Sequence, residues 1–107
     1  MSEPLAAPAT FHSAVEAWFW TMRTLRARRD TNETPDPDNL ADVIKRCLDT
    51  LYRRNRIKYE HCRILRIWGE RQVAPRMANP AERCDARMWD ETMDRLDWML
   101  RTKGIVA

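Results

Sequence analysis

Glycine is nearly missing from this sequence, since it occurs only twice in 107 residues. Glycine is the residue that adopts positive φ most readily, so the chain has few positions suited to the tight turns of β-hairpins. Cysteine is also sparse: Cys47, Cys62 and Cys84 are odd in number and widely spaced. We expect reduced thiols rather than a disulfide framework. These two shortages argue against a β-hairpin fold and against a disulfide-stapled scaffold.

Long apolar runs are absent as well, and none approaches the roughly 20 residues that a membrane-spanning helix needs. Residues 1–10 contain Glu3 but no lysine or arginine, so they lack the positive start of a secretory signal. We therefore expect a cytoplasmic protein with no membrane partner. A hydrophobic fraction of 44% beside 33% charged residues is typical of a soluble globular chain. The length suits one domain, residues 1–107, with a core of its own.

Motifs of catalysis and of cofactor binding are also missing. The sequence has no glycine-rich phosphate loop, no GxSxG, no HExxH and no CxxC, and its only histidines are His12 and His61. His61 and Cys62 are adjacent, but neighbours on a helix project about 100° apart and do not share a metal site by themselves. We expect no enzyme, no cofactor, no metal and no small-molecule substrate.

The apolar residues that follow Thr10, a plausible N-cap, recur at intervals of three and four. This period predicts a helix to about Arg29 with one buried face, formed by Phe11, Val15, Trp18, Met22 and Leu25. Residues 1–9 are expected to form a flexible tail before it. Residues 30–39 read DTNETPDPDN, and their two prolines predict a linker that cannot continue the helix.

A second helix is predicted to start at Asp36 as N-cap and Pro37 as its first residue. Its apolar residues have the clearest helical spacing in the chain: Leu40, Val43, Ile44, Cys47, Leu48, Leu51 and Tyr52. Asn55 tolerates left-handed backbone and is expected to turn the chain into a third helix over residues 58–72. The connection between these two helices is short.

A fourth helix is predicted after the break at Pro75. Asn79 is expected to cap it, Pro80 to take the first position, and Glu82 to return a capping carboxylate. Its buried face contains Met88, Trp89, Met93, Leu96 and Leu100, and Gly104 is a suitable terminator. The fold class is therefore all-α, an open bundle of four main helices in which helices two and three form a pair resembling a helix-turn-helix.

Positive charge is concentrated in residues 51–76, which contain eight basic and two acidic side chains. With Tyr59, six of the basic residues form what we call the basic patch: Arg53, Arg54, Arg56, Lys58, Tyr59, Arg63 and Arg66. Arginines on the second helix of a helix-turn-helix pair contact bases, while cations at the turn contact the phosphate backbone. The patch predicts a small protein that binds duplex DNA, a transcriptional regulator or accessory factor. The alternative is an ordinary solvated face in which Arg66 pairs with Glu70.

Two tryptophans fall outside the predicted core faces. Trp20 projects almost opposite the buried side of the first helix, and Trp98 lies opposite the apolar stripe of the fourth. Exposed tryptophan is enriched at interface hot spots, so the second hypothesis is a protein-interaction module or inhibitor, possibly a homodimer, that binds through these residues. The alternative is that residues 1–9, or Ile105 and Val106, fold over them.

The segments ILRIWGERQVAP, residues 64–75, and MWDETMDRLDWMLRTKGIV, residues 88–106, resemble small uncharacterised helical proteins of proteobacterial, mobile-element type. The resemblance covers roughly the second half of the chain and carries no established activity or site. It implies a regulator or accessory factor somewhat more than a metabolic enzyme.

Overall fold

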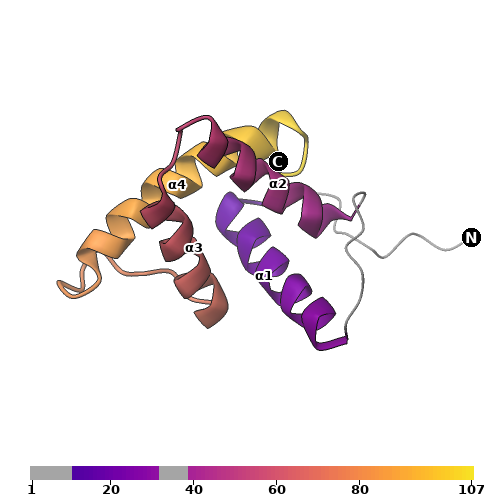
Figure 1. Ribbon diagram of the computed structural model, residues 1–107. Coiled ribbons are helices and arrows are strands. Elements are labelled where there is room, and N and C mark those ends of the chain that lie inside the picture. Colours follow the sequence, from indigo (N-terminus) through magenta and orange to yellow (C-terminus); the bar gives the residue numbers. More distant parts are fainter. Residues whose placement is uncertain (1–10, 32–38) are drawn as a thin grey trace, which may run out of the picture.

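The computed structural model describes residues 11–31 and 39–107, and within them the fold is the predicted all-α bundle of four helices. In chain order these are α1 (Ala14–Thr31), α2 (Leu40–Arg53), α3 (Tyr59–Arg71) and α4 (Arg83–Thr102), as Figure 1 shows. The only β-structure in the described ranges is an isolated parallel bridge between Phe11 and Val106. The predicted tail, residues 1–9, lies outside the described residues, as does most of the predicted linker. None of the four helices is both long enough and apolar enough to cross a bilayer.

Helix α1 packs against α2, α3 and α4, and each of these helices likewise contacts the other three. Its buried residues are Ala14, Ala17, Trp18 and Thr21, whereas Val15, Met22 and Leu25 are only partly buried. The single buried face that the periodicity predicts is therefore wrong in detail. The buried residues are spaced i, i+3, i+4 and i+7, so α1 has one buried face, rotated from the predicted one, and its small alanines let neighbouring helices approach closely.

Phe11 lies before α1 rather than within it, and joins the two ends of the described chain. Its backbone N–H donates to the carbonyl of Ile105 at 2.9 Å, and its carbonyl accepts from the N–H of Ala107 at 2.9 Å. The Phe11 ring packs against Trp20 with 5.5 Å between ring centroids. The C-terminal residues thus close over the start of α1.

Helix α2 begins later than predicted. Asn39 is the N-cap: its backbone is extended and its side-chain oxygen accepts from the N–H of Ala41 at 2.9 Å. The start predicted at Asp36 and Pro37 is therefore wrong, and those two residues lie outside the described ranges. The predicted core face is confirmed for Ile44, Cys47, Leu48 and Leu51, but not for Tyr52, which is 46% exposed.

The turn between α2 and α3 follows the prediction closely. Asn55 has the expected positive φ, 60°, and Ile57 is buried beneath the turn. Helix α3 ends at a second left-handed residue, Gln72, whose φ is 58°. Helix α3 buries Ile64, Leu65 and Trp68 on one face and leaves the patch residues Tyr59, Arg63 and Arg66 exposed on the other.

Helix α4 begins at Arg83, not at Pro80, because the predicted capping residues form a turn before the helix. The side-chain oxygen of Asn79 accepts from the N–H of Ala81 at 3.0 Å, and the Glu82 carboxylate accepts from the N–H of Arg76 at 2.8 Å. These side chains therefore satisfy turn donors. The C-terminal prediction holds, since Gly104 has φ of 77° directly after the helix.

Helices α1 and α3 cross at Gly69. A methyl group at this position would lie 2.7 Å from Nε1 of Trp18 and 2.8 Å from Cγ of Met22, so only glycine fits without displacement. The indole N–H of Trp18 donates to the carbonyl of Leu65 at 3.0 Å. This crossing fixes the relative position of the basic side chains that α1 and α3 present to solvent.

Candidate nucleic-acid interface

All seven residues of the basic patch are exposed, at the end of α2, in the turn and on α3: Arg53, Arg54, Arg56, Lys58, Tyr59, Arg63 and Arg66. Tyr59, the aromatic residue of the patch, is 62% exposed. The short turn directs the chain away from α2, and α3 then buries Ile64 and Leu65 so that its other face remains in solvent. The local sequence thus accounts for the exposure of the patch.

No cation of the patch is in an ion pair with another described residue. Within residues 11–31 and 39–107, ion pairs join Arg28 to Asp42 and Arg101 to Asp97, and His61 forms a hydrogen bond with Glu91. Arg66 and Glu70 do not form an ion pair. The alternative of an ordinary solvated face depends on that pair. In the described part of the chain, the positive charges of the patch therefore have no carboxylate partner.

A cleft of about 520 Å³ lies between α1, α2 and α3, and three patch residues line it: Tyr59, Arg63 and Arg66. We call it the arginine cleft, because α1 adds Arg26, Arg28 and Arg29 to its lining and α2 adds Lys45. Its apolar lining comes from Trp18, Met22, Leu25, Leu48 and Cys62. Three carboxylates also border it, from Asp42, Asp49 and Glu70. The lining therefore carries more positive than negative charge, and it also includes apolar side chains.

The arginines of α1 are functional candidates that the sequence analysis missed. They belong to the segment RTLRARR, residues 23–29, whose density of arginine is the signal that could have found them. Arg28 has a structural role: its side chain is 11% exposed, and Nη1 donates to both carboxylate oxygens of Asp42 at 3.0 Å. Arg26 and Arg29 are exposed, so these two are free to act beside the patch.

A second groove, of about 400 Å³, lies between α2 and α4, and we call it the Trp98 groove. Arg54 of the patch lines it together with Arg46 and Lys103, and the remaining lining residues are Val43, Cys47, Thr50, Trp98, Met99 and Thr102. The structure thus divides the patch. Three of its residues face the arginine cleft, Arg54 faces the Trp98 groove, and Arg53, Arg56 and Lys58 lie at the exposed end of α2 and in the turn between the two.

The two predicted interface tryptophans differ in their surroundings. Trp98 is 67% exposed, as the sequence analysis expects. Trp20 is only half-exposed, since it packs against the core and its ring contacts Phe11. The prediction that Trp20 projects away from the core is wrong, because Phe11 packs on that side of α1. Phe11 is held there by backbone hydrogen bonds to the C-terminal residues, which helical periodicity does not predict.

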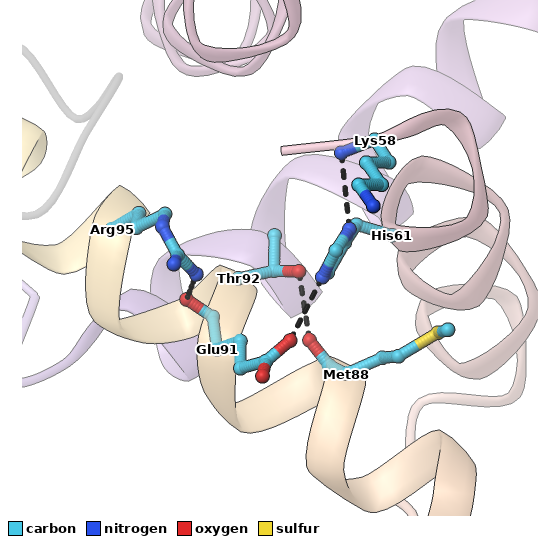
Figure 2. A network of polar contacts seen from close by, with 6 residues as sticks. All are labelled: Lys58, His61, Met88, Glu91, Thr92 and Arg95. Carbon is cyan, nitrogen blue, oxygen red and sulfur yellow. Dashed lines mark hydrogen bonds and ion pairs between the residues drawn. The ribbon is translucent and has the colours of Figure 1, made fainter. Parts of the chain in front are cut away.

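His61 connects the first turn of α3 to α4, as Figure 2 shows. Its Nδ1 accepts from the backbone N–H of Lys58 at 3.0 Å, so the ring carries its proton on Nε2 and donates it to Glu91 Oε1 at 3.0 Å. Chiefly through this hydrogen bond, His61 lowers the pKa of the Glu91 carboxyl. The contact holds the helix end that carries Tyr59 against α4.

The three cysteines are free thiols: Cys47 is buried, Cys62 half-buried and Cys84 exposed. Burial raises the pKa of both the Cys47 and the Cys62 thiol, which keeps them protonated and unreactive. Within the described ranges, no three side chains of histidine, cysteine, aspartate or glutamate are grouped as ligands for a metal ion.

Comparisons with protein-family models, with curated proteins and with solved structures find no match to this chain.

Proposed function

We propose that this protein binds duplex DNA through the α2–α3 turn and the exposed face of α3, as a regulator of transcription or an accessory factor. The observation that supports the proposal is the set of exposed patch cations that have no carboxylate partner among the described residues. A surface that carried charge only for solubility would be expected to pair some of it locally, as α4 does between Asp97 and Arg101. Unpaired cations gain most when they neutralise phosphates and release counterions.

The two parts of the patch have different proposed roles. Arg53, Arg56 and Lys58 in and beside the turn contact backbone phosphates, which sets orientation without reading sequence. Arg63 and Arg66 on α3 contact base edges, where a guanidinium forms two parallel hydrogen bonds to guanine. Arg26 and Arg29 of α1 face them across the arginine cleft and add phosphate contacts. Binding to the chromosome fits the cytoplasmic location expected from the sequence.

The alternative function, a protein-interaction module, keeps Trp98 as its support because that indole is largely exposed. Its second residue, Trp20, is occupied by Phe11. One exposed tryptophan is a weaker basis for an interface than six unpaired cations.

Duplex binding is tested by titrating a fluorescent blunt duplex at several salt concentrations. If about five phosphates are contacted, log K should fall against log salt with a slope between about −4 and −5. The double charge reversal Arg53→Glu, Arg56→Glu should reduce the slope by about 2 and weaken binding to every sequence at least roughly tenfold. Arg63→Ala should instead reduce the difference between sequences.

The matched control is Arg76→Glu, Arg87→Glu, which makes the same change in charge at exposed arginines outside the patch. It should bind DNA nearly as the unmodified protein does. Equal loss in both double variants would show that only net charge matters, and no loss in the patch variant would exclude the patch as the DNA-binding surface.

A further inference from the structure

The Trp98 groove has an exposed indole and an apolar lining, which binding to phosphate alone does not require. Trp98 is the most exposed large hydrophobic side chain in the described part of the chain. Beside it, α2 and α4 supply apolar lining from Val43, Cys47 and Met99. An indole left in solvent at the mouth of a partly apolar groove of about 400 Å³ is suited to hold a flat, apolar ring.

The charges around this groove all have one sign. Its charged lining residues are Arg46, Arg54 and Lys103, and no described carboxylate lines it. The nearby carboxylates of α4, Asp94 and Asp97, line a different groove, against α1. Arg46 and Lys103 lie close enough to Cys47 to lower the pKa of its thiol against the larger, opposite effect of burial. An occupant of the groove therefore meets concentrated positive charge.

The hydroxyl groups in the groove are already engaged. Thr50 donates to the carbonyl of Arg46 at 2.9 Å, and Thr102 donates to the carbonyl of Trp98 at 2.9 Å. The side chains of Arg54 and Lys103 are therefore the main donors to a ligand. A flat apolar ring attached to an anion matches this combination of stacking surface and charge.

We propose that the Trp98 groove binds single-stranded DNA, with one unpaired base stacked on the indole of Trp98 and the adjacent phosphates contacted by Arg54 and Lys103. The inference rests on the proposed function, because Arg54 belongs to the basic patch and makes the groove continuous with the turn. The protein then contacts duplex DNA through the turn and α3, and an unpaired strand that leaves the duplex through the groove.

Two other occupants fit the groove less well. In an intact duplex both faces of each internal base are stacked, so duplex DNA has nothing to offer the indole except at its ends. A second copy of this chain, placed symmetrically over the groove, would bring Arg54 and Lys103 against the same cations of its partner. Single-stranded DNA supplies both the free ring face and the negative charge.

The experiment compares a short fluorescent oligothymidine with a blunt duplex, titrated with the full chain and with two variants. Trp98→Ala should weaken oligothymidine binding roughly 5- to 150-fold, the range expected for one lost base stack, and leave duplex affinity within about twofold. Trp98→Phe should restore most of the affinity while removing the quenching of tryptophan fluorescence on binding. Lys103→Glu should weaken oligothymidine binding and leave the affinity for the duplex unchanged.

The outcomes separate this inference from the proposed function. Duplex binding without oligothymidine binding, or oligothymidine binding that ignores Trp98→Ala, overturns the inference and leaves the duplex proposal standing. Oligothymidine binding that depends on Trp98, without duplex binding, supports the inference about the groove and overturns the duplex proposal. Tighter binding of oligouridine or of an oligoglutamate peptide, or a dimer that Trp98→Ala dissociates, overturns the assignment of the groove to DNA.

Discussion

Trp18 lies at the crossing of α1 and α3 and Trp98 at the groove between α2 and α4, yet only Trp18 is buried. At the crossing of α1 and α3, Trp18 is 4% exposed, donates its N–H to Leu65 and lies against Gly69. At the groove between α2 and α4, Trp98 is left mostly in solvent. The first junction offers an acceptor for the indole N–H and a residue without a side chain. At the second, Trp98 lies beside a groove on the molecular surface, and most of its ring remains in water.

Burial of an indole in this protein depends on the residues that face it, not on the spacing of apolar residues along its own helix. Trp68 illustrates the same requirement, since its N–H donates to Asp85 at 3.0 Å while the guanidinium of Arg71 lies 4.9 Å from its ring centre. An exposed indole among cations is then a surface that the fold has not used for its own stability, which leaves it available to a ligand.

The largest effect should come from Trp18→Ala. Removing this side chain empties the α1–α3 crossing and leaves the Leu65 carbonyl without its donor, and we expect a loss of about 3–5 kcal/mol of unfolding free energy. Urea denaturation followed by far-UV circular dichroism measures it. Trp98→Ala is the matched control and should stay within about 0.5 kcal/mol of the unmodified protein. Similar losses in the two variants would contradict the comparison.

Gly69→Ala tests the other side of the same crossing. The added methyl group would lie closer than van der Waals contact to both Trp18 and Met22, and overpacking of this kind costs about 1–3 kcal/mol. Ala is otherwise the better helix former, so a gain in unfolding free energy would show that the crossing is looser than described. The double variant with Met22→Ala should recover part of the loss, because Met22 is one of the two contacts.

The effect expected for Trp20→Ala lies between those of Trp18→Ala and Trp98→Ala. The variant loses one partly buried ring contact with Phe11, worth about 1 kcal/mol, and keeps the rest of the core. The thermal midpoint should fall slightly and should not depend on protein concentration, since Trp20 packs within the chain. A midpoint that rises with concentration in the unmodified protein and not in the variant would instead place Trp20 in a dimer interface.

Much of the fold follows from local sequence. The glycine shortage, the helical spacing and the left-handed Asn55 predicted four helices and the turn, and α3 differs from its predicted bounds by one residue at each end. The predicted N-caps were less accurate than the predicted helices, because several nearby residues can act as an N-cap. Asn39 caps α2 in place of Asp36, and Asn79 and Glu82 stabilise a turn before α4 instead of its first turn.

The seven patch residues could also be found from the sequence, since a run of cations beside one apolar helix face must be exposed wherever that face is buried. Their grouping could not. That Arg63 and Arg66 share a cleft with Arg26 and Arg29, while Arg54 shares a groove with Trp98, depends on which helices lie side by side. Helical periodicity records the direction of each side chain around its own axis, and contains nothing about the neighbour that the side chain meets.

The helices, the positive turn and the exposure of α3 are local properties, because they depend on backbone preferences and on the separation of apolar from charged faces over a few residues. Tertiary contacts set which side of α1 is buried and place Phe11 against Trp20. Those outcomes depend on close packing between segments distant in sequence, where a single missing side chain at Gly69 decides how near two helices approach.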